Sequence, residues 1–206
     1  MRDSKLITGA LAILAVAGVS AYLVLGRGAD AQSGPTEFTD TPGPNLVIEL
    51  GGEAEGTITI DLLPNVAPEN VARLTELADS GAYDGVVFHR VIDGFMAQTG
   101  DVEFGRFGGD TSRAGRGGSE LPDLPAEFSN VPYERGVVGM ARTANPNSAN
   151  SQFFIMFAPG LNLNGNYTVV GRVIEGMDVV DSIKKGDGPN GAVTDPDYMA
   201  RVYVER

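Results

Sequence analysis

Short apolar runs separated by glycine-rich segments constrain the fold of this chain more than any other feature of its sequence. Four such runs follow residue 85, namely VVFHRVI, GVVGMA, SQFFIMF and YTVVGRVI. Each is shorter than an average helix and rich in valine, isoleucine and phenylalanine, and this pattern predicts strands. Upstream, NLVIEL and GTITIDLL predict two more strands joined by a turn at Gly51-Gly52, and YMARVYVE predicts the last strand.

Two segments have the apolar spacing of amphipathic helices. APENVARLTELADSG places Pro68 in the first turn and Gly81 just after the last, and GMDVVDSIKKG lies between Gly176 and Gly186. The expected apolar faces are Val71, Leu74 and Ala78 in the first helix, and Val179, Val180 and Ile183 in the second. Many short strands with two helices predict a β-rich α+β fold, in which a closed barrel is capped by the helices.

The N-terminus carries a separate hydrophobic segment. The stretch from Leu6 to Leu25 has no charge and is long enough to span a bilayer, and Arg2 and Lys5 precede it. Ala29-Asp30-Ala31 matches the small-x-small pattern of signal-peptidase sites. We expect a signal peptide cleaved after Ala31, with an uncleaved inner-membrane anchor as the alternative. In either case the basic residues stay in the cytoplasm and the remainder is exported to the periplasmic side.

The expected organisation of the 206 residues has three parts. Residues 1–31 form the signal peptide or membrane anchor. Residues 32–44, QSGPTEFTDTPGP, are rich in turn-forming residues, lack periodicity and predict a linker. Residues 45–206 form a single globular domain, which agrees with the usual size of domains. We expect this domain to be a monomer.

Charge and residue usage exclude several classes of function. The formal net charge is −12, which is the wrong sign for a surface that binds the phosphates of nucleic acids. The chain has no cysteine, so disulfides, thiol catalysis and cysteine-ligated metals are excluded. Its single histidine also excludes a multi-histidine metal site. We therefore expect no nucleic-acid partner and no cysteine-ligated or multi-histidine metal site.

Arg90 lies within the largely apolar stretch VVFHRVIDGFMAQTGD, where a buried guanidinium needs a partner. That partner is either a nearby acidic residue or a substrate. On a strand, Met96 and Gln98 would share one face, and in SQFFIMF the same holds for Gln152 and Phe154. Two strands that each present a polar and an apolar side chain provide what a small concave binding site requires, and this favours a functional role for Arg90.

Other candidate groups have weaker support. His89 could act as a general base, but neighbouring strand residues face opposite sides of a sheet, so we expect His89 to face the core if Arg90 faces a site. KKGDGPNG lacks the acid spacing of a calcium loop, and GRGG lacks the lysine of a phosphate loop. A pair of loop carboxylates could serve a glycosidase. The candidates are Asp101, Glu103, Asp110, Glu120, Asp123 and Glu127.

Three motifs in order along the chain resemble those of the cyclophilins. FHRVIDGFMAQTGD is similar to the first cyclophilin signature, MARTANPNSANSQFFIMF to the second, and LNLNGNYTVVGRVIEGMDVVDSI to a third block in its bacterial form. The resemblance covers about residues 45–206. It implies a closed eight-stranded antiparallel β-barrel capped by two helices, and a peptidyl-prolyl cis-trans isomerase that needs no cofactor.

The resemblance also implies roles for individual residues. Arg90 matches the family's catalytic arginine. The substrate-binding positions are Phe95, Met96, Phe154 and Leu163 in the apolar proline pocket, Gln98 and Gln152 beside it, Ala141 and Arg142 along the residue before proline, and Tyr167. Arg142 stands where many relatives have asparagine, and Tyr167 where many have histidine. Asn162 stands where many eukaryotic relatives have the tryptophan that helps bind cyclosporin, so we expect weak cyclosporin binding.

Together these features predict an isomerase of exported proteins. Rotation about an X-Pro bond is slow because the amide is planar, and a donor aimed at the nitrogen stabilises the twisted imide. We expect Arg90 to be that donor, in an apolar pocket that holds the proline ring. The expected partners are proline-containing peptides and unfolded exported proteins, whose folding the enzyme would assist. The alternative is a proline-binding chaperone or assembly module in which catalysis is incidental.

Overall fold

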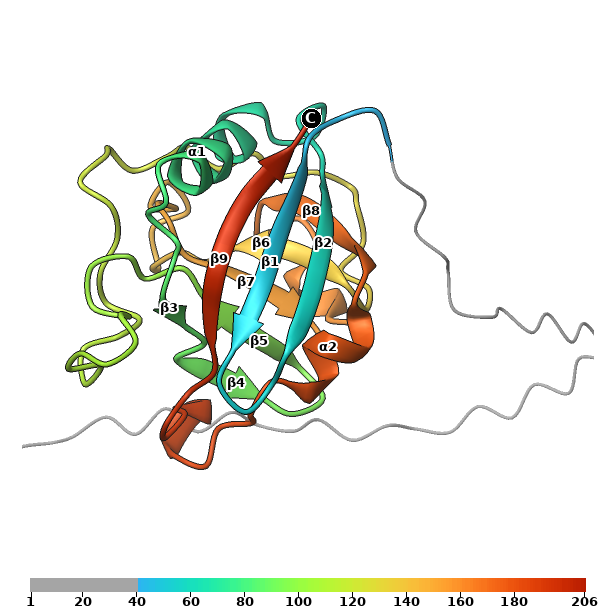
Figure 1. The fold of residues 1–206 in the computed structure, drawn as a ribbon. Helices are drawn as coiled ribbons and strands as arrows, with labels where there is room; N and C mark the ends of the chain where they lie inside the picture. Colours follow the sequence, from blue (N-terminus) through green and yellow to red (C-terminus); the bar gives the residue numbers. More distant parts are fainter. Residues whose placement is uncertain (1–40) are drawn as a thin grey trace, which may run out of the picture. The chain divides into compact units, whose positions relative to one another are not determined.

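The computed structural model describes residues 41–206. The predicted export segment, residues 1–31, and most of the predicted linker lie outside the described residues. Within residues 41–206, no helix has both the length and the apolar character needed to cross a membrane. This part of the chain forms a curled antiparallel sheet with two α-helices packed on it (Figure 1).

The sheet contains nine strands, and two loops contain short 3-10 helices, η1 and η2. In chain order the elements are β1 (Asn45–Gly51), β2 (Gly56–Leu62), α1 (Pro68–Asp79), β3 (Val86–Val87), β4 (Arg90–Ile92), β5 (Met96–Thr99), β6 (Val137–Met140), β7 (Phe153–Met156), η1 (Leu161–Leu163), β8 (Val169–Glu175), α2 (Met177–Ser182), η2 (Pro189–Gly191) and β9 (Tyr198–Glu205). The strands are hydrogen-bonded in the order β3-β9-β1-β2-β8-β6-β7-β5-β4, and all pairs are antiparallel. The expected β-rich α+β class is confirmed.

The expected closed eight-stranded barrel is wrong, because the sheet has nine strands and its hydrogen-bonded ladder ends at β3 on one edge and at β4 on the other. Both edge strands come from VVFHRVI, which the sequence predicts as a single strand. The run divides because its two halves pair with different strands, β3 with β9 and β4 with β5. Between them, Phe88 N donates to Asp197 O at 2.8 Å and His89 O accepts from Val193 N at 3.3 Å, so both residues bond to the segment before β9.

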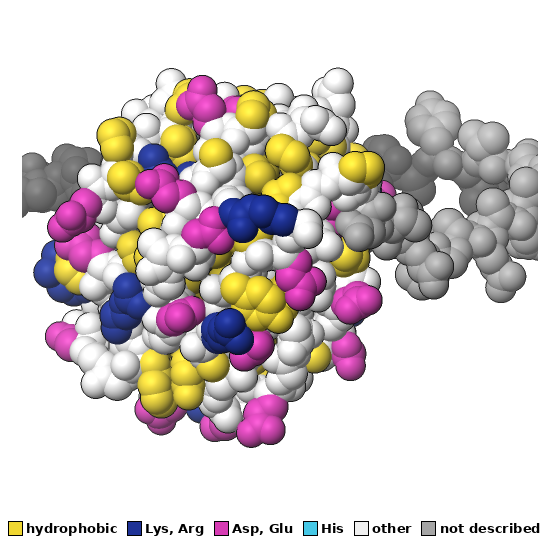
Figure 2. All heavy atoms as spheres, turned by 45° about the horizontal axis from the view of Figure 1, so that its top comes forward, with side chains coloured by type: hydrophobic (Ala, Val, Ile, Leu, Met, Phe, Trp, Pro, Cys, Tyr) yellow, Lys and Arg dark blue, Asp and Glu magenta, His cyan; other side chains and the backbone are white. Residues whose placement is uncertain are grey.

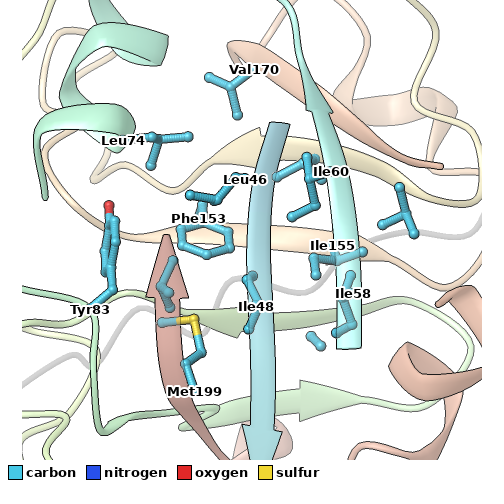
Figure 3. Close-up of a cluster of buried hydrophobic side chains, with 14 of the residues drawn as sticks. Leu46, Ile48, Ile58, Ile60, Leu74, Tyr83, Phe153, Ile155, Val170 and Met199 are labelled. Carbon is cyan, nitrogen blue, oxygen red and sulfur yellow. The ribbon is translucent and has the colours of Figure 1, made fainter. Parts of the chain in front are cut away.

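The alternation along β1 and β2 places their apolar residues in the core. Leu46 lies opposite Ile60 and Ile48 lies opposite Ile58, and all four side chains are fully buried. Figure 3 shows these residues together with Phe153 of β7 in the main core. Burial of each such side chain contributes roughly 1.5–3 kcal/mol, and a slip by one residue would move all of them to the other face. The pattern therefore fixes the register of the two strands.

Helix α1 has the boundaries that its sequence predicts. Pro68 occupies its first turn, and Gly81 follows its end with φ +70°. The predicted stripe of Val71, Leu74 and Ala78 is buried, and the helix packs against β9 near one end of the sheet (Figure 1). The local sequence signals and the tertiary packing agree here.

Helix α2 is shorter than predicted and ends at Ser182, before the predicted stop at Gly186. Ile183 leaves the helical conformation, with φ −53° and ψ 130°, and buries its side chain in the core. Lys184 N then donates to the buried carboxylate of Asp197 at 2.8 Å. The helix is therefore stopped by tertiary contacts and not by the glycine.

The buried apolar side chains form two clusters, and β7 contributes to both. Phe153 and Ile155 belong to the main core, which also contains the buried faces of both helices. Phe154 and Met156 belong to a smaller cluster, because successive residues of a strand face opposite sides of the sheet. The buried members of this smaller cluster are Met96, Tyr133, Val137, Phe154, Met156, Leu163 and Val169. It forms the floor of the candidate site.

Candidate functional site

A row of side chains crosses β4, β5 and β7 and ends at a glycine of β6. The register pairs Arg90 with Gln98, Gln98 with Phe154, and Phe154 with Gly139. Directly opposed residues of antiparallel strands project from the same face of a sheet. A guanidinium, an amide and an aromatic ring therefore lie side by side, and the row changes from charged to apolar across three strands.

The glycine at the end of this row gives the ring of Phe154 its space. A Cβ at Gly139 would lie 2.7 Å from Phe154 Cζ and would also clash with Tyr133 Oη. Phe154 stacks on Tyr133 and meets Tyr167 edge-on, and in both pairs the ring centroids are 5.8 Å apart. Contacts of both kinds favour a fixed orientation of aromatic rings. The ring is therefore held as a firm wall of the site.

These side chains line a pocket of about 190 Å³. Its lining consists of Arg90, Phe95, Met96, Gln98, Ala141, Arg142, Phe154, Leu163 and Tyr167. Nine of the ten residues that the sequence assigns to the site thus meet in one pocket, and the tenth, Gln152, accepts a hydrogen bond from Gln98 Nε2 at 2.9 Å. Met96, Phe154 and Leu163 are buried and provide the apolar surface.

The guanidinium of Arg90 is held at this pocket by neutral groups. Its Nη1 donates to Gln98 Oε1 at 3.1 Å, its Nε donates to the carbonyl of Asn190 at 3.0 Å, and its Nη2 donates to Asn190 Oδ1 at 3.3 Å. Within residues 41–206, Arg90 has no ion pair with a carboxylate. Partial burial lowers the pKa of Arg90 below its ordinary value, but a guanidinium stays protonated in proteins. The charge is therefore positioned without being neutralised.

A directional chain of hydrogen bonds continues from Arg90 across the sheet. Because a guanidinium can only donate, Gln98 must accept with Oε1 and donate with Nε2. Gln152 accepts that bond with Oε1 and donates with Nε2 to the carbonyl of Gly117 at 2.8 Å. The guanidinium, which can only donate, fixes the orientation of both amides. A continuous series of hydrogen bonds therefore links Arg90 to the loop around residue 117.

Sequence reasoning missed Asn190, which supplies two of the acceptors for Arg90. Asn190 adopts a left-handed conformation with φ 57°, inside the segment KKGDGPNG that was considered above as a weak calcium loop. The Pro-Asn-Gly sequence is a signal for a turn. Nothing local to it indicates a partner that lies one hundred positions earlier in the chain, so this contact could only be found in the structure.

Arg142 is fixed beside the pocket by its own set of acceptors. Its Nε and Nη2 donate to the carbonyl of Asn166 at 3.0 and 2.7 Å, and its Nη1 donates to the carbonyl of Thr143 at 2.9 Å. The guanidinium carbon lies 4.4 Å from the centroid of the Tyr167 ring. Arg142 is therefore oriented by two carbonyls and one aromatic face.

Comparison with known proteins identifies the family to which this arrangement belongs. A model of the family described as cyclophilin type peptidyl-prolyl cis-trans isomerase/CLD matches residues 46–204. The chain belongs to the cyclophilin family. Over 154 residues this cyclophilin is 59% identical to a probable peptidyl-prolyl cis-trans isomerase of Brucella suis, an alignment that covers 73% of the chain and 79% of the relative. The predicted family and enzyme class are confirmed.

Less similar relatives and solved structures also carry the name of a cyclophilin or of a peptidyl-prolyl isomerase. Peptidyl-prolyl cis-trans isomerase-like 1 of Neurospora crassa is 42% identical over 129 residues, which cover 61% of this cyclophilin and 73% of the relative. The crystal structure of cyclophilin AquaCyp293 from Hirschia baltica has a TM-score of 0.62 and 28% identity, and covers 77% and 72% of the two chains. A cyclophilin-type isomerase of Cryptosporidium parvum has the same fold, with a TM-score of 0.66 at 24% identity over 79% of this chain and 99% of that one.

A second pocket, of about 480 Å³, adjoins the first. The two pockets share Gln98, Ala141 and Arg142. The outer wall of the second is the GRGG loop, whose position in this cyclophilin depends on the fully buried Asp101. Asp101 Oδ2 accepts the N–H groups of Gly115 at 2.7 Å and Gly117 at 2.9 Å, and Oδ1 accepts those of Glu103 and Phe104, which follow Asp101 in the chain. One carboxylate therefore holds the loop.

His89 lines neither pocket of the cyclophilin. Both ring nitrogens are buried and have no hydrogen-bond partner among the described residues, and a Cβ at Gly115 would lie 3.0 Å from Nε2. Burial lowers the pKa of His89 to about 4, although the nearby Asp101 carboxylate acts in the opposite direction. The ring is neutral at neutral pH and lies beneath the GRGG loop, away from the first pocket but in neither apolar cluster, so the expectation that it faces the core is only partly met.

The loop carboxylates do not form a second catalytic centre in the described part of this cyclophilin. Of the six acids considered for a glycosidase, only Asp123 lines either pocket. Asp101 accepts four backbone N–H groups, and Glu127 accepts from the backbone and side chain of Asn70 at 2.9 and 2.6 Å. Within residues 41–206, no cluster of three or more His, Cys, Asp or Glu side chains is placed to hold a metal ion.

Proposed function

We propose that this cyclophilin accelerates rotation about X-Pro bonds in exported proteins, and that Arg90 stabilises the twisted imide. The observation that carries the mechanism is the setting of the guanidinium. It lines an apolar pocket, its hydrogen bonds go to neutral acceptors, and within residues 41–206 it has no ion pair with a carboxylate. A positive charge in that setting is available to a ligand in the pocket.

The rate enhancement that the site must provide is modest. Rotation about the planar amide faces a barrier of about 18–20 kcal/mol and takes tens to hundreds of seconds unaided. Bringing this step to milliseconds needs about five decades of rate, or roughly 7 kcal/mol. A well-placed charged donor supplies roughly 3–4 kcal/mol when it acts on charge that develops in the transition state. The remainder must come from contacts that fit the twisted geometry better than either planar one.

The pocket divides this work between two kinds of group. In the twisted state the imide nitrogen regains its lone pair, which the Arg90 guanidinium stabilises. The proline ring is gripped by the apolar pocket residues Phe95, Met96, Phe154 and Leu163, beside Gln98, Gln152 and Tyr167. Ala141 and Arg142 lie along the residue before proline. Rotation forms and breaks no covalent bond, so the reaction needs no nucleophile and no general base.

Binding of proline peptides is supported by a structural neighbour. The cyclophilin-type isomerase of Cryptosporidium parvum was crystallised in the presence of the dipeptide Ala-Pro. The apolar pocket of about 190 Å³ in the present chain is of the small, concave kind that a single ring can fill. We take proline-containing segments of unfolded exported proteins as the substrates.

Substitution of Arg90 tests the mechanism. In a protease-coupled assay with an Ala-Pro-Phe peptide, Arg90→Ala should lower kcat/KM by about 10²–10³-fold, and Arg90→Lys should recover part of the loss. Arg201→Ala, an exposed arginine on β9, is the matched control and should leave the rate unchanged. Full activity of Arg90→Ala would refute the role of the guanidinium. Undiminished refolding of a client protein by that variant would favour the chaperone alternative.

The export role is tested by the N-terminus of the protein recovered from a bacterial host. The basic residues before the apolar segment Leu6–Leu25, and the small-x-small sequence ending at Ala31, support a periplasmic location. Gln32 as the first residue of a periplasmic product would establish cleavage, and Met1 on a protein facing the periplasm would establish an anchor. Recovery of the intact chain from the cytoplasm would refute export.

A further inference from the structure

Two arginines line the second pocket of a strongly acidic protein. The chain has a formal net charge of −12, and acidic side chains are spread over the face shown in Figure 2. The charged residues that line the second pocket are Arg116, Arg142 and Asp123, and Arg90 lines the adjoining proline pocket. Three cations and one anion therefore face a continuous cleft, which is opposite in sign to the protein as a whole.

Neither arginine of the second pocket is neutralised by a carboxylate among the described residues. Arg142 is oriented by the carbonyls of Asn166 and Thr143 and by the Tyr167 ring, none of which carries a negative charge. The exposed Arg116 side chain has no hydrogen-bond or ion-pair partner within residues 41–206. Both charges are therefore available to a bound molecule.

The backbone beneath Arg116 is fixed even though its side chain is free. The residues on either side of it, Gly115 and Gly117, both donate their N–H groups to the buried Asp101 carboxylate. The guanidinium is thus carried on an anchored loop and not on a loose one. Asp123, the opposing charge, accepts from Asn150 Nδ2 at 3.1 Å and is exposed.

The spacing of an extended peptide determines which substrate residue meets these charges. The residue before proline is restricted to extended conformations. Side chains two apart on an extended chain project to the same side, about 7 Å from one another. A peptide whose proline ring fills the first pocket and whose preceding residue follows Ala141 and Arg142 therefore points the side chain two positions before proline toward the second pocket, across the shared wall.

We propose that the second pocket selects an aspartate or glutamate two residues before the proline, so that the preferred substrates are acidic proline-containing segments. This inference rests on the proposed isomerase function. The guanidinium fork matches the geometry of a carboxylate, and Arg142 is already held in place, so little side-chain freedom is lost when the pair forms. The acid beneath the loop, Asp101, already accepts four backbone N–H groups, and acids farther from the cleft than the screening length of about 8 Å at physiological salt contribute little within it.

Peptides that differ only at this position test the proposal. The peptides are Glu-Ala-Pro-Phe, Gln-Ala-Pro-Phe and Lys-Ala-Pro-Phe, with blocked N-termini, and the enzyme is the full-length chain in mild detergent. We expect kcat/KM to fall in the order Glu, Gln, Lys, with about a fivefold to tenfold difference between the extremes, as two partly exposed charge pairs would give. The difference should shrink at 0.5 M salt, in keeping with screening to about 4–5 Å.

Variants assign the selectivity to the two arginines. Arg116→Gln and Arg142→Gln should each lower the Glu-to-Lys ratio, and the double variant should bring it close to one. Arg201→Gln makes the same change of net charge on β9, outside both pockets, and should leave the ratio unchanged. Equal rates for all three peptides with the wild type would overturn this proposal while leaving the isomerase function intact. Absence of catalysis with any of them would instead refute the isomerase function, and a ratio that survives the double variant would assign the selectivity elsewhere.

Discussion

Phe153 and Phe154 are neighbours on β7, yet they serve different parts of the molecule. Phe153 is fully buried in the main core, where it meets Tyr83 edge-on with a centroid distance of 5.7 Å. Phe154 is 5% exposed and forms a wall of the first pocket, in the same row as Gln98 and Arg90. The two faces of one strand thus have different chemistry, apolar throughout on one side and apolar beside polar on the other.

This difference shows how the sheet combines stability with an open site. A pocket wall that must contact a ligand cannot be fully covered by other elements, so its support has to come from beside it and from behind. Here Tyr133 and Tyr167 hold the Phe154 ring from the side, and the main core lies on the other face of the sheet. Substitutions on the two faces should therefore separate the effects on stability from the effects on catalysis.

The largest expected effect is on the core face. Phe153→Ala should lower the free energy of unfolding by about 3–5 kcal/mol, because it removes a fully buried ring and leaves a cavity. Urea unfolding followed by circular dichroism measures the loss. A cost below about 1 kcal/mol would show that the core rearranges around the gap, and the contrast between the two faces would then fail.

A second change from core to site occurs between β3 and β4, where Phe88 joins the core, Arg90 joins the site, and His89 lies beneath the GRGG loop. The pKa of His89 is lowered to about 4 from an ordinary 6.5, so the unfolded chain binds the proton more readily between these values. The free energy of unfolding should therefore fall as the pH drops from 6.5 to 4, by about 3 kcal/mol in total from this group.

His89→Gln removes the titrating imidazole, so comparing it with the wild type isolates the contribution of His89. Because acidic residues also titrate in this range, the quantity to measure is the difference between wild type and variant in unfolding free energy, determined at several pH values between 4 and 7. That difference should change with pH in favour of the variant as the solution becomes more acidic. If the unfolding free energies of the two proteins change with pH in parallel, His89 binds protons equally well in the folded and unfolded states, and the prediction is wrong.

On the site face, the expected change is in catalysis. Phe154→Leu keeps an apolar side chain at the pocket wall, so the free energy of unfolding should fall by less than about 1.5 kcal/mol. Loss of the ring that stacks on Tyr133 and meets Tyr167 edge-on should lower kcat/KM by about tenfold, equivalent to about 1.4 kcal/mol of transition-state binding. Peptide isomerisation and urea unfolding, measured on the same preparation, separate the two. A variant as unstable as Phe153→Ala would remove the distinction between the faces.

The smallest effect is expected at Asn190, which contacts the site from outside the sheet. Asn190→Gly keeps the left-handed backbone and the carbonyl acceptor of Arg90 but removes the Oδ1 acceptor. One partly exposed hydrogen bond is worth about 0.5–1 kcal/mol, so kcat should fall by about twofold to fivefold. An unchanged kcat would show that Gln98 and the Asn190 carbonyl suffice to hold the guanidinium.

The sequence predicts the strands and α1 well because their signals are local. Alternation in GTITIDLL and the Pro68-to-Gly81 punctuation depend only on neighbouring residues, and the structure confirms both. The pocket residues were found through the resemblance of three motifs to a known family, and nine of the ten line one pocket. Periodicity alone indicates only that Met96 with Gln98, and Gln152 with Phe154, share faces.

The features that the sequence did not predict depend on contacts between distant segments. VVFHRVI reads as one strand, but its first half pairs with β9 and its second half with β5. Helix α2 ends early because Lys184 N finds the buried Asp197. No local pattern contains these partners, so the open ladder, the short helix and the Asn190 contact become visible only in three dimensions.

The two short strands at the edges of the sheet have a consequence for a protein that would handle unfolded chains. Exposed strand edges recruit extended polypeptides by backbone pairing, which leads to aggregation. Here β3 and β4 are only two and three residues long, and each is bridged on its outer side, Val86 to Arg106 and Arg90 to Ala192. An incoming chain therefore finds little unpaired backbone at these edges, which disfavours its retention by strand pairing with the sheet.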